Sequence, residues 1–453
     1  VSNLALMDLC LEAKEQGLDR KEFLRRAAGI PGIYVPSLYE VSYREDGTIR
    51  SFAPLYEDVP AVVRKVIELD LDDDYYPEHP VVPFIKVTQD RVVLEIQRGC
   101  IRGCRFCQAG MVYRPVRERS LEYLKKKGRE MLKSTGHEEI SLSSLSSSDY
   151  SELGGIVNDL IEAAGQQGVN ISLPSLRIDA FSLDVMSKVQ DIKKSSLTFA
   201  PEAGTQRLRN VINKGLTEED ILTGAAAAFE GGWNKVKLYF MLGLPSETEE
   251  DMRGIALLSN EVARVYYDTV PKEKRNGRVQ VTASSSFFIP KPFTPFQWAS
   301  MLEPEEYLDR ARIVNHTFKE QLNRKSLNYQ WHSPEVTIIE GVLARGDRRV
   351  GRVIEEAYRR GCIYDAWTET FRYSVWMEAF RTVGIDYHFY TSRERGLDEI
   401  FPWDFIDAGV TKDFLIREWK RAREGKITPN CRAGCSGCGA KSFGGGVCYE
   451  AEN

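Results

Sequence analysis

The stretch Arg98-Gly-Cys100-Ile-Arg-Gly-Cys104-Arg-Phe106-Cys107 is the chemical centre of this chain. Three cysteines separated by three and then two residues can place their thiolates on one side of a small loop. Three thiolates do not complete a tetrahedral zinc site, and they leave one iron of a four-iron cluster without a protein ligand. The spacing therefore predicts a metal centre with an open position for a small chelating cofactor. Zinc with a distant fourth ligand and scattered buried cysteines are the alternatives.

The cysteine loop directly follows Val92-Val-Leu-Glu-Ile96, a short apolar stretch typical of a strand buried in a parallel sheet. Strand and helix patterns then alternate six times, which predicts a right-handed parallel sheet and an incomplete (βα)6 barrel of the TIM type. In such a fold the active groups lie at the carboxyl ends of the strands, where the cysteine loop is placed. The later strands are expected at 139–142, 169–173, 197–199, 235–242 and 279–288.

The other patterns predict further units around the barrel. The N-terminal unit has helices up to Gly29, a hairpin turn at Asp46-Gly47 and a short helix near 60–68. The C-terminal region begins with a strand near 329–332 and continues with helices. We therefore expect an N-terminal α+β segment, the barrel, a mostly helical region and a cysteine-rich tail, at residues 1–88, 89–325, 326–428 and 429–453 respectively.

A second cysteine group lies in the tail. Cys431, Cys435 and Cys438 repeat the spacing of the first group, and Cys448 can supply a fourth thiolate. The glycines between them allow the backbone to fold tightly around a metal. The sequence leaves three interpretations open: an auxiliary iron–sulfur cluster, a structural four-thiolate zinc site, and an unligated tail.

Composition restricts the class of protein. The net charge of −5 provides no global basic field for nucleic acid, although a local basic groove is compatible with it. No apolar run approaches the length of a membrane span, and no signal peptide precedes the first helix. Six of the nine cysteines fall in two tight groups, which argues for ligated thiolates in a reducing compartment. These features predict a cytoplasmic protein.

The cysteine loop, with Phe106 before its last cysteine and at the end of the first strand of a βα series, resembles the signature of the radical S-adenosylmethionine (SAM) superfamily. There, three cysteines hold a [4Fe–4S] cluster, and SAM chelates the fourth iron. One-electron reduction cleaves SAM to a 5′-deoxyadenosyl radical that abstracts hydrogen from the substrate. The aromatic and Arg-rich C-terminal region makes RNA or a ribosomal component one option for the unidentified substrate, and a small molecule or peptide fits as well. The resemblance implies an oxygen-sensitive enzyme. It also implies an external reductant of the flavodoxin or ferredoxin type.

Other stretches resemble the cobalamin-binding-type radical SAM proteins, whose function is poorly defined. The resemblance extends from about Gly29 to the last cysteine. Longer relatives have a cobalamin-binding-like domain upstream, which fits a chain that starts at Val1 without methionine. Relatives are often paired with a small radical SAM-linked protein. Cobalamin itself has no support here, because Asp386-Tyr-His388 is not followed by the residues of a lower-ligand motif. The matching stretches are 141–150, 174–179, 199–205, 237–248 and 288–298.

The resemblance also implies residues that contact SAM. Arg177 and Glu202, which end the third and fourth strands, correspond to the polar residues that meet the SAM carboxylate and ribose. A guanidinium pairs bidentately with a carboxylate, and a carboxylate accepts hydrogen bonds from two hydroxyls. The alternative is that these two side chains pair with each other. The segment that meets the SAM amino group departs from the commoner Gly-Gly-Glu and consists of Ser146, Ser147, Ser148 and Asp149.

The C-terminal region and the chain as a whole each allow an alternative interpretation. His332 and the arginines of residues 345–352 form either an anion- or RNA-facing patch or an ordinary charged helical face. The second hypothesis for the whole chain is an iron–sulfur or zinc module for electron transfer or assembly, without SAM turnover. The three N-terminal cysteines together with Arg177 and Glu202 disfavour that module.

Overall fold

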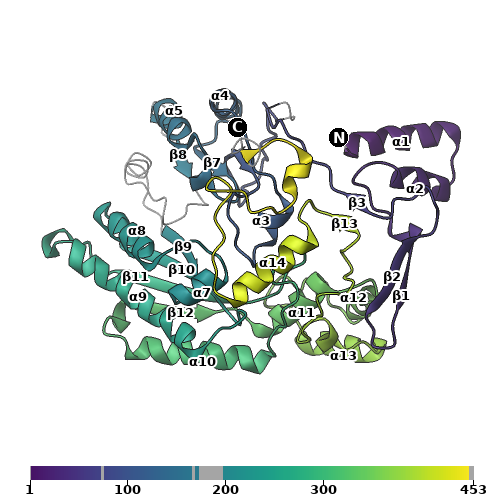
Figure 1. The fold of residues 1–453 in the computed structure, drawn as a ribbon. Helices are drawn as coiled ribbons and strands as arrows, with labels where there is room; N and C mark the ends of the chain where they lie inside the picture. The colour runs from purple at the N-terminus through teal and green to yellow at the C-terminus, as the bar shows by residue number, and fades with distance from the viewer. Residues whose placement is uncertain (1, 73–75, 166–168, 173–196, 448–453) are drawn as a thin grey trace.

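The computed structural model describes residues 2–72, 76–165, 169–172 and 197–447, and its centre is built of parallel strands (Figure 1). One sheet has the order β4-β7-β8, and the other has the order β12-β11-β10-β9. All neighbouring strands in both sheets are parallel, as the alternating pattern predicted. The described strands form no closed barrel. Their bounds are β4 Val92–Glu95, β7 Glu139–Ser143, β8 Asn170–Ser172, β9 Leu197–Glu202, β10 Lys235–Leu242, β11 Gln280–Phe287 and β12 Leu327–Trp331.

Strand β12 extends the parallel series beyond the six expected strands. Its residues were assigned to the C-terminal region, but Leu327 to Trp331 pair in parallel with Val281 to Ser285 of β11. The ring of Tyr329 stacks on Phe318 at a centroid distance of 5.1 Å, and its hydroxyl donates to Ser285 Oγ at 3.1 Å. These contacts attach the strand to the edge of the four-stranded sheet. The sequence did not show the pairing with β11, because its residues lie about 44 positions earlier in the chain.

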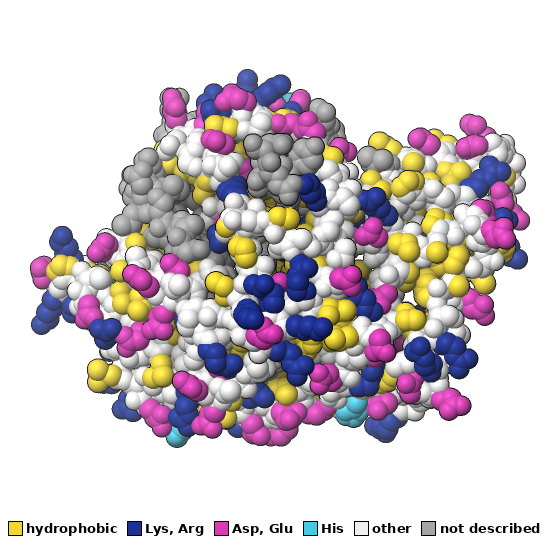
Figure 2. Space-filling view, viewed as in Figure 1, with side chains coloured by type: hydrophobic (Ala, Val, Ile, Leu, Met, Phe, Trp, Pro, Cys, Tyr) yellow, Lys and Arg dark blue, Asp and Glu magenta, His cyan; other side chains and the backbone are white. Residues whose placement is uncertain are grey.

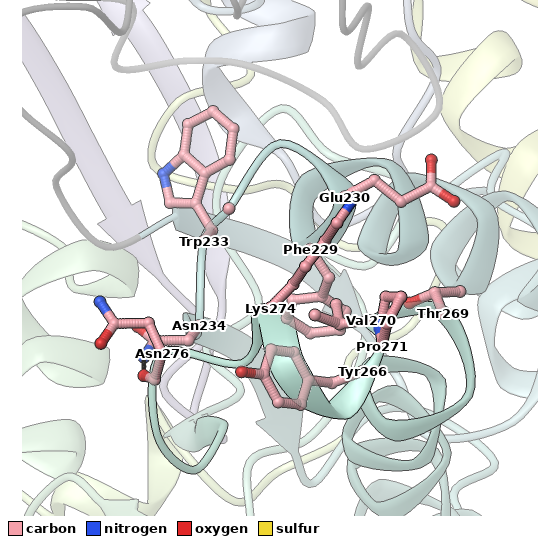
Figure 3. Close-up of a pocket in the computed structure, with 11 residues that line it drawn as sticks. Phe229, Glu230, Trp233, Asn234, Tyr266, Thr269, Val270, Pro271, Lys274 and Asn276 are labelled. Atoms are coloured by element: carbon pink, nitrogen blue, oxygen red, sulfur yellow. Dashed lines mark hydrogen bonds between the residues drawn. The ribbon is translucent and has the colours of Figure 1, made fainter.

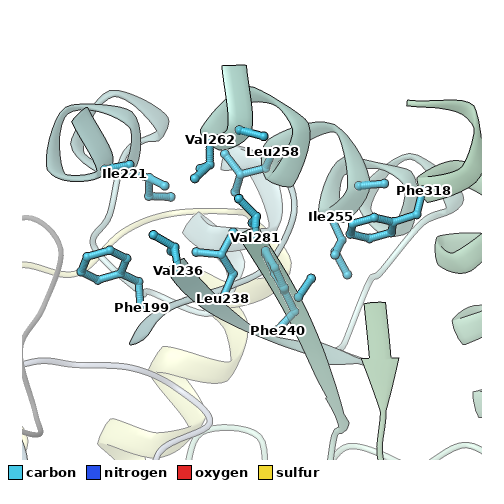
Figure 4. Packing of buried hydrophobic residues seen from close by; sticks show 14 of the residues in the cluster. Phe199, Ile221, Val236, Leu238, Phe240, Ile255, Leu258, Val262, Val281 and Phe318 are labelled. Carbon is cyan, nitrogen blue, oxygen red and sulfur yellow. The ribbon is translucent and has the colours of Figure 1, made fainter. Parts of the chain in front are cut away.

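The largest hydrophobic core lies between this sheet and the helices that cover it: α8 (Glu218–Glu230), α9 (Glu249–Thr269) and α10 (Pro304–Glu320). Side chains alternate along a strand, so every second residue of β10 points to one face. Val236, Leu238 and Phe240 are buried on the helix side and pack with Ile255 and other α9 residues (Figure 4). Parallel strands covered by helices are typical of α/β folds.

A short pair of strands joins the N-terminal unit to a late part of the chain. Helices α1 (Ser2–Gln16) and α2 (Arg20–Ala28) precede β1 (Tyr39–Tyr43) and β2 (Ile49–Pro54), and Asp46-Gly47 makes the expected turn. The short helix predicted near 60–68 is wrong. Residues 63–64 form strand β3 (Val63–Arg64), which pairs in parallel with β13 (Ile406–Asp407), because Val63 is buried in a cluster that includes Phe405.

The C-terminal region is helical, as expected. Its four longer helices are α11 (Pro334–Arg345), α12 (Val350–Arg359), α13 (Tyr373–Val383) and α14 (Lys412–Arg423). Among the described residues, we find no helix with the length and apolar character needed to cross a membrane.

Gly204 tests the packing of the loop after β9 against α9. A Cβ atom at this position would lie 2.5 Å from both Asp251 O and the carbonyl carbon of Gly254, which are backbone atoms that cannot turn away. We expect Gly204→Ala to lower the free energy of unfolding by about 3 kcal/mol, measured by urea denaturation. Gly154→Ala is the control, because a Cβ atom there meets nothing within 4 Å. Equal losses in both variants would contradict the packing described.

Candidate functional site

The cysteine loop, residues 99–107, lies between a two-stranded ribbon and a short helix at the carboxyl end of β4. The ribbon is β5 (Gln97–Arg98) paired antiparallel with β6 (Arg117–Glu118), and the helix is α3 (Gln108–Val112), whose N-cap is Cys107. Gly99 has a φ of +89°, and a Cβ atom there would lie 2.7 Å from Tyr113 O. Only glycine fits this start of the loop.

The three thiols of the loop are all free and half-buried. The backbone N–H of Arg102 donates to Cys100 Sγ at 3.4 Å, and that of Gly110 donates to Cys107 Sγ at 3.3 Å. Burial, and then the neighbouring Cys104, raise the pKa of Cys100 to about 12 and also raise the pKa of Cys107. Bare thiolates are therefore disfavoured here, and a bound cation is needed to hold them deprotonated.

The donor set of the loop fits an iron–sulfur cluster better than a single ion. In the described part of the chain, no three His, Cys, Asp or Glu side chains are grouped so as to hold one metal ion. In a cluster, each cysteine binds a different iron, so the sulfurs need not converge on one point. Backbone N–H groups directed at two of the sulfurs are also suited to cluster ligands.

Arg105, which lies between Cys104 and Phe106, fixes the middle of the loop. Its side chain is fully buried and pairs with Glu418 of α14 at 3.0 Å. The same guanidinium donates to Val211 O at 2.8 Å and to Lys426 O at 2.6 Å. The loop is thus attached to both α7 (Gln206–Val211) and α14.

The C-terminal tail packs directly on the cysteine loop (Figure 1). The backbone N–H of Cys431 donates to Ile101 O at 3.0 Å, and both side chains are buried in one small cluster. Asn213 joins the two segments, because its side-chain amide donates to Gly103 O at 3.0 Å and to Thr428 O at 3.1 Å. No sequence signal indicated that the two cysteine groups are neighbours.

The tail cysteines differ in their surroundings. Cys431 and Cys438 are buried, whereas Cys435 is exposed. Cys438 belongs to a hydrophobic cluster with Trp419 and other residues, distinct from the cluster of Cys431. Cys448 lies outside the described residues.

The segment expected to meet the SAM amino group lies against the cysteine loop. Asp149 accepts hydrogen bonds from Arg102 Nε at 2.9 Å and from Ser146 Oγ at 2.7 Å. Gln97, just before the loop, donates from Nε2 to Ser146 O at 2.7 Å. Ser146, Ser147 and Asp149 are buried, and Ser148 is half-buried. The structure thus brings this segment and the loop together.

Glu202 lies near Cys107, whereas Asp149 lies near Cys100. Glu202 has a φ of +68°, which is uncommon for a residue other than glycine and frequent at functional sites. Its carboxylate pairs with Lys214 Nζ at 3.1 Å, and that ammonium lies 5.9 Å from the centre of the Phe106 ring. Sequence reasoning missed Lys214, which belongs to no recognisable motif. Arg177, the expected neighbour of Glu202, lies outside the described residues.

A polar surface faces away from the helices on β10. Since Val236 and Leu238 point to the core, Lys237 and Tyr239 point to the opposite face. Lys237 is in register with Thr198 of β9 and Thr282 of β11, so a cation and several hydroxyls share this face. Such groups can bind a polar substrate by hydrogen bonds.

Of the two alternatives for residues 345–352, the anion-facing patch is wrong for Arg345. Its side chain is fully buried and donates to Ala299 O at 2.9 Å and Thr391 O at 3.0 Å. Arg348 and Arg349 donate to backbone carbonyls of the hairpin unit, those of Tyr39 and Gly47. These three arginines therefore bind parts of the protein itself.

One cavity of about 380 Å³ lies away from the cysteine loop (Figure 3). Asn234 and Asn276, which line it, precede β10 and β11, so it opens at the amino ends of these strands. Trp233 and Tyr266 contribute aromatic walls. Because the cysteine loop lies at the carboxyl end of β4, this cavity is not part of the candidate site.

The Arg105–Glu418 pair provides a test of how the loop is fixed. Arg105→Leu leaves Glu418 buried without its partner, and we expect a loss of about 3–5 kcal/mol in the free energy of unfolding. The double variant Arg105→Leu with Glu418→Leu is expected to lose less, because no buried charge remains. Urea denaturation measures both. A double variant as unstable as the sum of the single variants would show that the two groups are not coupled.

Comparison with known proteins shows that part of this chain matches a family model. Residues 94–258 match the model of the Radical SAM superfamily. An uncharacterized protein of Methanocaldococcus jannaschii is 32% identical over 307 residues, covering 66% of this chain and 64% of that protein. A putative methylthiotransferase of the same organism is 25% identical over 169 residues, covering 35% of this chain and 37% of that protein. The chain thus spans less than two thirds of either relative's length.

Similar solved structures include the radical SAM methyltransferase TsrM from Kitasatospora setae, with a TM-score of 0.38 and 13% identity over 65% of this chain and 51% of that one. Methylornithine synthase is another, with a TM-score of 0.33 and 14% identity over 73% of this chain and 82% of that one. The family model covers Cys100, Cys104 and Cys107, so the resemblance of this chain to the radical SAM superfamily, expected from those cysteines, is confirmed.

Proposed function

We propose that this chain is a radical SAM enzyme in which Cys100, Cys104 and Cys107 hold a [4Fe–4S] cluster with one iron open for SAM. The observation that most directly supports this proposal is the loop of three free, half-buried cysteines after β4, which lies inside the region that matches the family model. When bound, the cluster and SAM supply the radical chemistry, in which one electron cleaves SAM and the resulting 5′-deoxyadenosyl radical takes hydrogen from the substrate.

In this proposal the two parallel sheets belong to one incomplete barrel. Chain order supports it, because β8 ends one sheet and β9, the next described strand, ends the other. The polar face of β10, with Lys237 and Tyr239, then lines the interior where the substrate binds. Active groups at the carboxyl ends of parallel strands are the rule in such folds.

The protein's own groups position SAM in this proposal. The hydroxyls and backbone of Ser146 to Ser148 bind its amino group, and Asp149 holds that segment on the loop through Arg102. Glu202 accepts hydrogen bonds from the ribose hydroxyls, while its ion pair with Lys214 holds the carboxylate in place. Phe106 covers the loop beside Lys214, and Arg177 pairs with the SAM carboxylate.

The tail forms a second metal site in this proposal. Its candidate ligands are Cys431, Cys435, Cys438 and Cys448, for either an iron–sulfur cluster or zinc. The contact of Cys431 with Ile101 supports a site close to the first one. Since the tail packs on the loop, its removal would disturb both sites, and single substitutions are the cleaner test.

Cys104→Ala tests the central assignment. We expect the anaerobically reconstituted variant to lose about four irons per chain and all SAM cleavage, because a cluster ligand is missing. Iron analysis and assay of 5′-deoxyadenosine measure both losses. Cys10→Ala, in α1, is the matched control and is expected to behave as the unmodified protein. Retained iron and SAM cleavage in Cys104→Ala would refute the proposal.

Exposed Cys435 allows the two sites to be separated. Cys435→Ala is expected to lose metal from the tail and to keep the cluster of the first loop. Iron, sulfide and zinc analysis then identifies the tail metal. If either Cys104→Ala or Cys435→Ala empties both sites, the cysteines form one joint site. If the addition of SAM did not change the spectrum of the reduced cluster, the result would favour an electron-transfer module without SAM turnover.

Glu202→Gln tests the proposed ribose contact. The substitution removes the charge but keeps the shape, and we expect the Kd for SAM to rise about tenfold, as for the loss of one charge-assisted hydrogen bond. Equilibrium dialysis with the reconstituted protein measures the Kd. Glu219→Gln, on the exposed side of α8, is the control. An unchanged Kd in Glu202→Gln would place the ribose elsewhere.

A further inference from the structure

Helix α14 has a buried side and an exposed basic side. Its sequence, KDFLIREWKRAR, contains five basic and two acidic residues. Phe414, Leu415, Glu418, Trp419 and Ala422 are buried. Arg417, Lys420 and Arg423, spaced at three residues, are exposed on the opposite side. Figure 2 shows Lys and Arg side chains gathered over the position that α14 occupies in Figure 1.

Arg417, Lys420 and Arg423 are in ion-pair contact with no carboxylate of the described residues, although Asp413 and Glu424 line the same surface groove as Arg417 and Lys420. Among the described residues, Lys420 and Arg423 make no ion pair. Arg417 donates to the backbone carbonyl of Ser436, which leaves its charge unpaired. Glu418, the acidic residue within this stretch, points inward to Arg105. A protein with a net charge of −5 thus carries a local positive surface here.

The buried side of the same helix contacts the cysteine loop. Glu418 pairs with Arg105 of the loop at 3.0 Å, and the backbone carbonyl of Lys426, just after the helix, accepts a hydrogen bond from the same guanidinium. An α-helix is about 10 Å across, so the basic face lies about one helix diameter from the loop. Anything bound to this face lies close to Cys104 and its neighbours.

We propose that the exposed face of α14, defined by Arg417, Lys420 and Arg423, is the docking surface for an acidic one-electron carrier protein. The inference rests on the proposed function, because a cluster that cleaves SAM reductively must receive one electron for each cleavage. In the step, the reduced carrier loses one electron and the cluster gains it, and no bond forms or breaks between the two proteins.

The observations favour an acidic protein over a nucleic acid. Electrons must enter near the cluster, and this face lies there. Its unpaired cations occupy one side of a single short helix. A long polyanion would also meet the field of an acidic protein beyond that patch, whereas a compact acidic protein would meet only the patch. Charge complementarity of this kind mainly steers association.

The test uses an acidic [2Fe–2S] ferredoxin as the probe and the double variant K420E/R423E. We expect its Kd for ferredoxin to rise at least about tenfold, with a weaker salt dependence, because opposite charges become like charges. Biolayer interferometry at several salt concentrations measures this. The neutral variant K420Q/R423Q is expected to have a Kd between those of the unmodified protein and K420E/R423E. The control K272E/K274E makes the same charge change at exposed lysines before β11 and is expected to leave the Kd unchanged.

A second readout separates this inference from the proposed function. In K420E/R423E, ferredoxin-driven SAM cleavage is expected to fall about tenfold, in line with the Kd, while dithionite-driven cleavage stays unchanged. Equal ferredoxin affinity in this variant and the unmodified protein would overturn the docking surface and leave the enzyme proposal intact. No dithionite-driven cleavage in the unmodified protein would overturn the enzyme proposal itself. If K420E/R423E lost binding to single-stranded RNA but kept its affinity for ferredoxin, the face would be reassigned to nucleic-acid binding.

Discussion

The buried guanidinium of Arg105 is the interaction on which the cysteine loop depends. An isolated charge in a protein interior is costly, and here the cost is offset by Glu418 and by the carbonyls of Val211 and Lys426. These partners are 106 to 321 positions away in the chain. The shape of the loop therefore depends on contacts with α7 and with α14 and the segment after it, so the proposed metal site depends on distant parts of the chain.

The cysteine loop and the Ser146–Asp149 segment act as one unit for a related reason. Asp149 is buried, and its carboxylate is satisfied by Arg102 of the loop and by the hydroxyl of Ser146. A buried carboxylate that lost either partner would be costly, so the ends of β4 and β7 are held in a fixed relation. The sites proposed for the cluster and for the SAM amino group are thereby positioned by the same ion pair.

Local signals in the sequence were sufficient for much of this fold. The apolar run before Cys100 identified β4, and the strand expected at 235–242 coincides with β10, because a strand pattern depends on neighbours in the chain. Contacts between distant residues were not predictable. No pattern around Asn213 or Thr428 indicates that they join the tail to the loop, and none around Lys214 indicates a partner for Glu202. The strand β12 was recognised, but not the sheet to which it belongs.

The distribution of charge on α14 depends on which of its side chains the fold buries. In the sequence, its acidic and basic residues alternate with apolar ones and suggest an ordinary charged helix. In the fold, Glu418 is buried against Arg105, and Arg417, Lys420 and Arg423 are exposed with no ion pair to the described residues. The same pairing that fixes the cysteine loop thus also leaves a positive surface above it. The buried side of α14 supports the cysteine loop, and its exposed side is the proposed docking surface for the electron carrier. The same helix therefore affects both the stability of the site and the delivery of electrons to it.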